Sequence, residues 1–147
     1  MTATFQLCID CADPALLTRF WVAALGYQLE PPPAGFDNWD AYWREIGVAE
    51  DELGGGTDSI VDPAGNGPRI WFQIVPEAKT LKNRLHLDIR ASGGRANSIE
   101  LRKQRVDAEA DRLVALGATI RQVLDIDGLD HYAVAMADPE GNEFDIN

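Results

Sequence analysis

The sequence has only two cysteines among its 147 residues, Cys8 and Cys11. Their spacing, Cys-Ile-Asp-Cys, is that of a thioredoxin-like redox motif. Redox cysteines of that kind sit at a helix N-terminus, where the dipole lowers the thiol pKa, whereas residues 5–10 read as a strand followed by a turn. Strand positions three apart face opposite sides of a sheet, so we interpret the pair as two reduced, unrelated thiols.

Basic residues are also scarce, because 13 Lys and Arg stand against 24 Asp and Glu, for a net charge of -11. A field of that sign repels phosphate backbones and anionic lipid, so nucleic acid and membranes are not expected partners. It favours cationic or neutral ligands, although an acidic surface also simply keeps a protein in solution. The first residues, Met1 to Phe5, lack the basic region and apolar run of a secretory signal, so we expect a cytoplasmic location.

The residues that are present describe an ordinary globular chain, with 46% hydrophobic and 25% charged residues. Hydrophobic periodicity predicts two helices and eight strands. The first helix begins at Asp13-Pro14 and ends at Gly26, and the second ends at Gly117 after the apolar positions Val106, Ala110, Leu113 and Val114. The expected strands are residues 5–10, 27–30, 59–61, 69–75, 85–90, 118–124, 132–137 and 143–146.

Residues 34–58 form an excursion between two of these strands. Its centre places Trp39, Tyr42, Trp43 and Ile46 on one helical stripe that ends at Gly47. This stripe favours packing over recognition, and the alternative is a lid that closes over a site. Three successive glycines, residues 54–56, are expected to loosen the chain after it.

The two halves of the sequence repeat each other in order. Ala24-Leu25-Gly26 recurs as Ala115-Leu116-Gly117, and Asp62-Pro63-Ala64-Gly65-Asn66 recurs as Asp138-Pro139-Glu140-Gly141-Asn142. Gln6-Leu7-Cys8-Ile9 also matches His86-Leu87-Asp88-Ile89. Three matches in register predict two copies of a strand-helix-strand-strand-strand module.

With these motifs, together with Phe20-Trp21, residues 67–73, residues 82–88 and Glu143-Phe144, the chain resembles the vicinal oxygen chelate superfamily of glyoxalases, bleomycin-resistance proteins and extradiol dioxygenases. It looks most like the glyoxalase-like branch common in actinobacteria. The resemblance implies an α+β fold in which paired βαβββ modules form a curved mixed-sheet cup with the helices outside. It also implies one domain, residues 1–147, made of modules at about 1–78 and 82–147, and a homodimer.

Strand alternation gives an independent reason to expect a cup. One face of each strand is strongly apolar and is assigned to the helices: Phe5, Leu7, Ile9, Ile70, Phe72, Ile74, Leu85, Leu87, Ile89, Phe144 and Ile146. The opposite faces are polar: Gln6, Cys8, Asp10, Arg69, Trp71, Gln73, His86, Asp88, Arg90, Glu143 and Asp145. Polar residues lining a curved sheet cost stability unless they bind solvent, each other or a ligand, so we expect a small-molecule site.

By resemblance, four metal ligands project into this cup, at Gln6, Gln73, His86 and Asp145. The glyoxalases carry Glu at the second and fourth of these places, where this sequence has Gln73 and the shorter Asp145. One carboxylate and one imidazole make a weak set for a divalent ion. We therefore expect a metal-free pocket with a hydrogen-bonded His86–Asp145 pair; the alternatives are a tightly bound ion and an ion held loosely or with the help of the substrate.

Two functions remain open. In the first, a lyase or isomerase uses His86 or Asp145 in proton transfer, with Asp88 beside the imidazole. In the second, a binding protein of the bleomycin-resistance kind holds a small, cationic or aromatic compound against Trp71. Gln6, Cys8, Gln73 and Asp88 would contact the small molecule in either case, and Arg84 either holds an anionic group of the substrate or forms a structural ion pair.

Overall fold

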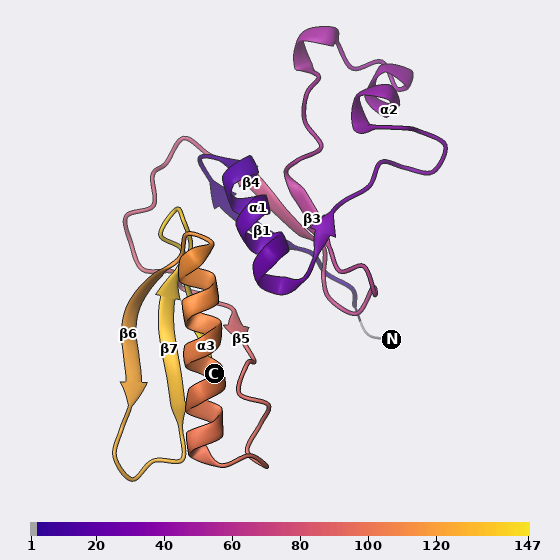
Figure 1. Ribbon diagram of the computed structural model, residues 1–147. Coiled ribbons are helices and arrows are strands. Elements are labelled where there is room, and N and C mark those ends of the chain that lie inside the picture. Colours follow the sequence, from indigo (N-terminus) through magenta and orange to yellow (C-terminus); the bar gives the residue numbers. More distant parts are fainter. Residues whose placement is uncertain (1–2) are drawn as a thin grey trace. The chain divides into compact units, whose positions relative to one another are not determined.

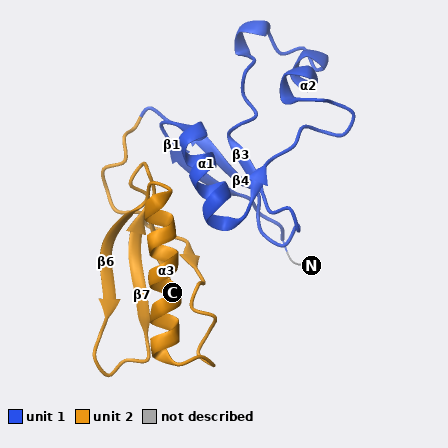
Figure 2. Ribbon diagram, viewed as in Figure 1, with its two compact units in different colours: residues 1–76 blue, residues 77–147 orange. Residues whose placement is uncertain are grey.

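The computed structural model describes residues 3–147 and has two compact units, residues 1–76 and 77–147, coloured separately in Figure 2. Each unit is a four-stranded mixed sheet with a helix packed on it (Figure 1). This confirms the predicted α+β class. That the units form one domain with a shared cup stays a prediction. Within residues 3–147, none of the helices combines the length and the apolar character needed to cross a membrane.

Unit 1 contains the elements of the first predicted module. They are β1 (Leu7–Cys11), α1 (Pro14–Leu25), β2 (Gln28–Leu29), α2 (Trp39–Glu45), the 3-10 helix η1 (Glu50–Glu52), β3 (Ser59–Val61) and β4 (Ile70–Ile74). The strand order is β1-β4-β3-β2, with β1 parallel to β4 and the other pairs antiparallel. The excursion with α2 and η1 leaves the sheet after β2 and returns at β3 (Figure 1).

Unit 2 repeats this topology. Its elements are β5 (Asp88–Ile89), α3 (Ile99–Ala115), β6 (Thr119–Asp125), β7 (Tyr132–Ala137) and β8 (Glu143–Ile146). The order is β5-β8-β7-β6, and again the first strand runs parallel to the last. The predicted internal repeat is therefore confirmed at the level of strand order.

Local sequence signals explain where the elements begin and end. The Asp13 carboxylate accepts a hydrogen bond from Leu16 N at 3.0 Å and caps α1, and Gly26 ends the helix in the left-handed region at φ 69. In the repeated turns, Asp62 accepts from the backbone N–H groups of Ala64, Asn66 and Gly67. These bonds lower the pKa of Asp62. The Asp138 carboxylate accepts in the same way from Glu140 N and Asn142 N.

The core of each unit lies between its helix and one face of its sheet. In unit 1 it contains Leu17, Phe20, Trp21, Ile60, Ile70 and Phe72, and in unit 2 Val106, Ala110, Leu113, Val134, Met136, Phe144 and Ile146. Four side chains predicted to be buried are exposed instead: Phe5, Ile74, Leu85 and Val114. Phe5 and Leu85 precede the short edge strands, Ile74 is the last residue of β4, and Val114 lies beside the helical stripe that packs on the sheet. Periodicity alone therefore misplaced all four.

Candidate functional site

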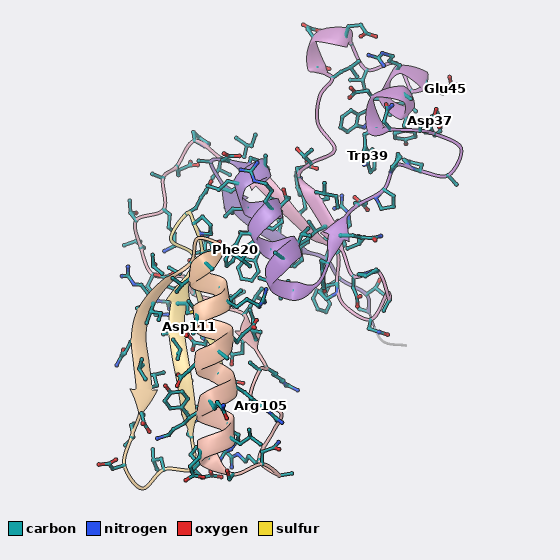
Figure 3. All side chains as sticks on the ribbon, in the orientation of Figure 1. Phe20, Asp37, Trp39, Glu45, Arg105 and Asp111 are labelled. Atoms are coloured by element: carbon teal, nitrogen blue, oxygen red, sulfur yellow. The ribbon has the colours of Figure 1, made fainter. Side chains whose placement is uncertain are left out.

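A pocket of about 250 Å³ lies in unit 1, on the face of the sheet that carries Arg69 and Trp71. Three tryptophans and four polar side chains line it: Trp39, Trp43, Trp71, Glu30, Asp58, Ser59 and Arg69. The two ends of the excursion and its helix α2 therefore meet β4 here. Trp39 projects from the inner side of the excursion, whereas Asp37 and Glu45 lie on its outer side (Figure 3).

An ion pair organises the polar wall of this pocket. Arg69 Nε donates to both carboxylate oxygens of Glu30 at 2.9 Å, and Arg69 Nη2 donates to Glu30 Oε2 at 2.6 Å. The same guanidinium donates to Ser59 Oγ at 2.8 Å and to Gln6 Oε1 at 2.9 Å. The bonds to Glu30 raise the pKa of Arg69 further above its usual value. Arg69 is thus a fixed structural cation whose charge Glu30 neutralises.

The tryptophan N–H groups are also engaged. Trp71 Nε1 donates to Asp58 Oδ2 at 3.0 Å, and Trp39 Nε1 donates to the Glu30 backbone carbonyl at 2.9 Å. The Trp39 and Trp43 rings lie 5.6 Å apart, and the Trp39 and Tyr42 rings 5.9 Å apart. The predicted stripe therefore does pack on itself, but it also contributes two walls of a pocket, and its fourth member, Ile46, is exposed.

Two of the glycines that follow α2, Gly55 and Gly56, allow close packing in addition to making the chain flexible. A Cβ on Gly55 would lie 2.6 Å from the Trp43 ring, and a Cβ on Gly56 would lie 2.5 Å from Trp39. Gly56 also has φ +84, which side chains rarely adopt. These two positions let the indole rings lie directly against the backbone.

Gln6 and Gln73, the two predicted metal ligands of unit 1, have their side-chain oxygens engaged by donors. Gln6 Oε1 accepts from Arg69, and Gln73 Oε1 accepts from the Cys8 thiol at 3.4 Å. Burial raises the pKa of Cys8, with Asp10 adding to the effect, and Cys11 is buried on the other face. Because the Gln6 oxygen already accepts from a guanidinium and the Gln73 oxygen from a thiol, this pair does not fit a metal ion as it stands.

Unit 2 brings together three of the predicted residues. His86 Nε2 lies 3.2 Å from Asp88 Oδ1 and 3.5 Å from Asp145 Oδ2, and Asn147 Nδ2 donates to Asp88 Oδ2 at 3.3 Å. The three possible ligand atoms all lie within 4.8 Å of one another. One imidazole and two carboxylates can hold a divalent ion or exchange a proton. Asp88 was predicted as a substrate contact, and its place beside His86 makes it a candidate metal ligand that the sequence did not indicate.

Two details of this cluster differ from the expected strand. β5 contains only Asp88 and Ile89, so His86 precedes the strand instead of lying on it. Arg84 is exposed and forms no ion pair within residues 77–147. His131 is exposed in the loop after β6. The four-residue set Gln6, Gln73, His86 and Asp145 is divided between the two units, and its convergence on one site stays a prediction.

Comparisons with known proteins identify the fold. A family model described as "Glyoxalase-like domain" matches residues 6–147. No curated protein sequence gives a significant match. Among solved structures, a glyoxalase/bleomycin resistance protein/dioxygenase family enzyme from Burkholderia phytofirmans superposes with a TM-score of 0.56 at 18% identity, covering 97% of this chain and 94% of that one.

A second similar structure is the fosfomycin resistance protein FosX from Listeria monocytogenes, solved with Mn(II) and a dihydroxypropylphosphonic acid. It has a TM-score of 0.60 at 11% identity, with 100% of this chain and 90% of that chain covered. TioX from Micromonospora gives a TM-score of 0.50 at 14% identity, with 99% and 97% covered. At sequence identities this low, the similarity to these structures shows a shared fold and not a shared function.

Proposed function

Because the chain belongs to the glyoxalase-like domain family, we propose that it is a small-molecule-binding protein whose ligand enters the tryptophan-lined pocket of unit 1. The observation that carries this proposal is the pocket itself. It combines aromatic walls with a few polar groups whose positions are fixed by hydrogen bonds, which is the usual composition of a ligand site. The engaged oxygens of Gln6 and Gln73 favour binding without a metal ion.

A fragment screen tests this proposal. Small aromatic and cationic compounds are ranked by thermal shift, and hits are titrated against the wild type, Trp71→Ala and Ile46→Ala. Ile46 is exposed in the same excursion but does not line the pocket. We expect hits to lose affinity in Trp71→Ala and to keep it in Ile46→Ala. Hits that bind both variants like the wild type, or a screen without hits, contradict the proposal.

The His86 cluster supports a second candidate, a lyase or isomerase in which His86 or Asp145 moves a proton. The imidazole lies beside two carboxylates that orient it, as a general base requires. The test is a screen of lyase and isomerase substrates in which any turnover is compared between His86→Ala, Asp145→Ala and His131→Ala. Turnover should disappear in the first two and persist in the third, and turnover retained in both of the first two removes this candidate.

We further propose a homodimer, on the family resemblance. Light scattering of the purified protein measures the mass directly, and a monomer at high micromolar concentration contradicts the proposal. The actinobacterial branch and the cytoplasmic location stay predictions.

A further inference from the structure

Aromatic rings form a large part of the pocket lining. Three of the four tryptophans in the chain line the pocket. The N–H groups of Trp39 and Trp71 donate to Glu30 and Asp58 respectively, so neither is available to recognise a ligand acceptor. What these rings offer is their π surface, and an indole face attracts cations more strongly than any other aromatic side chain.

The charges around the pocket favour the same sign of ligand. Glu30 is paired with Arg69, so these two groups cancel. Asp58 is the remaining charged group of the pocket. Its carboxylate accepts from the neutral donors Trp71 Nε1 at 3.0 Å and Ser59 Oγ at 3.2 Å, and its charge also acts on Arg69. The carboxylate has two oxygens and about four acceptor positions, so it retains capacity for a cation. The pocket therefore carries one negative charge beside an aromatic wall.

The aromatic wall is also held in place before any ligand arrives. The hydrogen bond from Trp39 to Glu30 fixes one ring, and Gly55 and Gly56 lie directly against Trp43 and Trp39. Because few side chains need to be ordered on binding, little conformational entropy is lost. A fixed cluster of aromatic rings next to a carboxylate is the arrangement that proteins use to bind methylated ammonium groups.

We propose that this pocket selects a compact organic cation carrying a methylated ammonium group, with the methyl groups against Trp39, Trp43 and Trp71 and the charge opposite Asp58; this inference rests on the proposed function. An unmethylated ammonium is strongly hydrated and loses more on entering an aromatic pocket. A pocket volume of about 250 Å³ is large enough for a head group of this size.

Choline and its uncharged isostere dimethylbutanol provide a matched pair of probes, because they share a shape and differ in charge. Binding is followed by tryptophan fluorescence at constant ionic strength, with sodium chloride as the salt control. We expect choline to bind at least about tenfold more tightly than dimethylbutanol. Asp58→Asn keeps the shape of the side chain and should reduce choline affinity by about tenfold or more.

The control variant is Asp51→Asn. Asp51 is exposed in η1 of the same excursion and does not line the pocket, so it changes the net charge equally without touching the site. Equal binding of the two probes, or equal loss in both variants, overturns the inference. If neutral aromatic fragments still bind in a manner that depends on Trp71, the proposed function survives that result. If neither probe nor any fragment binds, both fail.

Discussion

The six-membered ring of Trp43 lies against the Cα of Gly55, where an added Cβ would come within 2.6 Å of it. Gly55 does not have a positive φ, so a substitution there tests packing and not backbone strain. We expect Gly55→Ala to displace Trp43, to lower the free energy of unfolding by about 1–3 kcal/mol and to weaken ligand binding in the pocket. Urea unfolding and the choline titration measure the two effects.

Trp43→Phe provides the control, because it removes the ring atoms that the new Cβ would meet. Combining Trp43→Phe with Gly55→Ala should cost less stability than the two single changes added together. Strict additivity would mean that the Trp43–Gly55 contact does not position the ring.

The Arg69–Glu30 ion pair is expected to stabilise unit 1 because both side chains are half-buried, at 34% and 23% exposure. Arg69→Met leaves the Glu30 carboxylate without its partner, and we expect a loss of about 1–3 kcal/mol in the free energy of unfolding. Arg44→Met breaks the exposed Arg44–Glu50 pair of the same unit and should cost less stability than Arg69→Met, because solvent screens an exposed pair. Chemical denaturation of both variants measures the two losses in free energy of unfolding. Equal losses would mean that the burial of the Arg69–Glu30 pair adds nothing to its contribution.

The sequence predicted the elements whose limits are set by local chemistry. The predicted bounds of β3, β7 and β8 are those observed, and α1 lies between Asp13 and Gly26 as its capping residues indicated. These limits depend on turn residues and alternation within a few positions of one another. The repeat predicted that the two halves share one topology, because a second copy of a module repeats the first, and the matching strand orders agree with that.

The sequence could not predict contacts between residues far apart in the chain. Arg69 and Glu30 are separated by 39 positions, and no periodic pattern connects them. The role of Gly55 and Gly56 depends on Trp43 and Trp39, which a run of three glycines does not reveal. β5 is short because it is an edge strand that pairs only with the end of β8, through Asp88 with Asp145 and Ile89 with Ile146. Alternation alone predicted a strand from Leu85 to Arg90.

The residues that hold an added metal ion should be the His86, Asp88 and Asp145 cluster of unit 2. We expect weak binding of added Mn²⁺ or Zn²⁺ that Asp88→Asn reduces by at least about tenfold, because that variant removes one of two carboxylate ligands. Gln73→Ala should change it little, since the Gln73 oxygen already accepts from Cys8. Calorimetric titration of both variants distinguishes the two ligand sets. If the ion is held by Gln6, Gln73, His86 and Asp145 instead, Gln73→Ala should weaken metal binding and Asp88→Asn should change it little.

Acid should destabilise unit 2 through Glu143. Its carboxylate accepts from Asn83 N at 2.9 Å and pairs with Lys79 at 3.1 Å, and these interactions, with the Asn83 bond the largest, lower the pKa of Glu143 to about 2 from 4.5. A lowered folded-state pKa means that the stabilisation is fully present above pH 4.5 and is lost as the pH falls towards 2. Glu143→Gln should therefore flatten the pH dependence of the free energy of unfolding in this window.

Glu77→Gln is the matched control, because Glu77 is an exposed carboxylate of the same unit. Its free energy of unfolding should follow that of the wild type between pH 2 and pH 4.5, the window bounded by the two pKa values of Glu143. Urea unfolding at several pH values in that range gives both curves. If Glu143→Gln retains the acid sensitivity of the wild type, the bonds from Asn83 and Lys79 do not stabilise the ionised carboxylate, and the link between the start of unit 2 and β8 depends on packing instead.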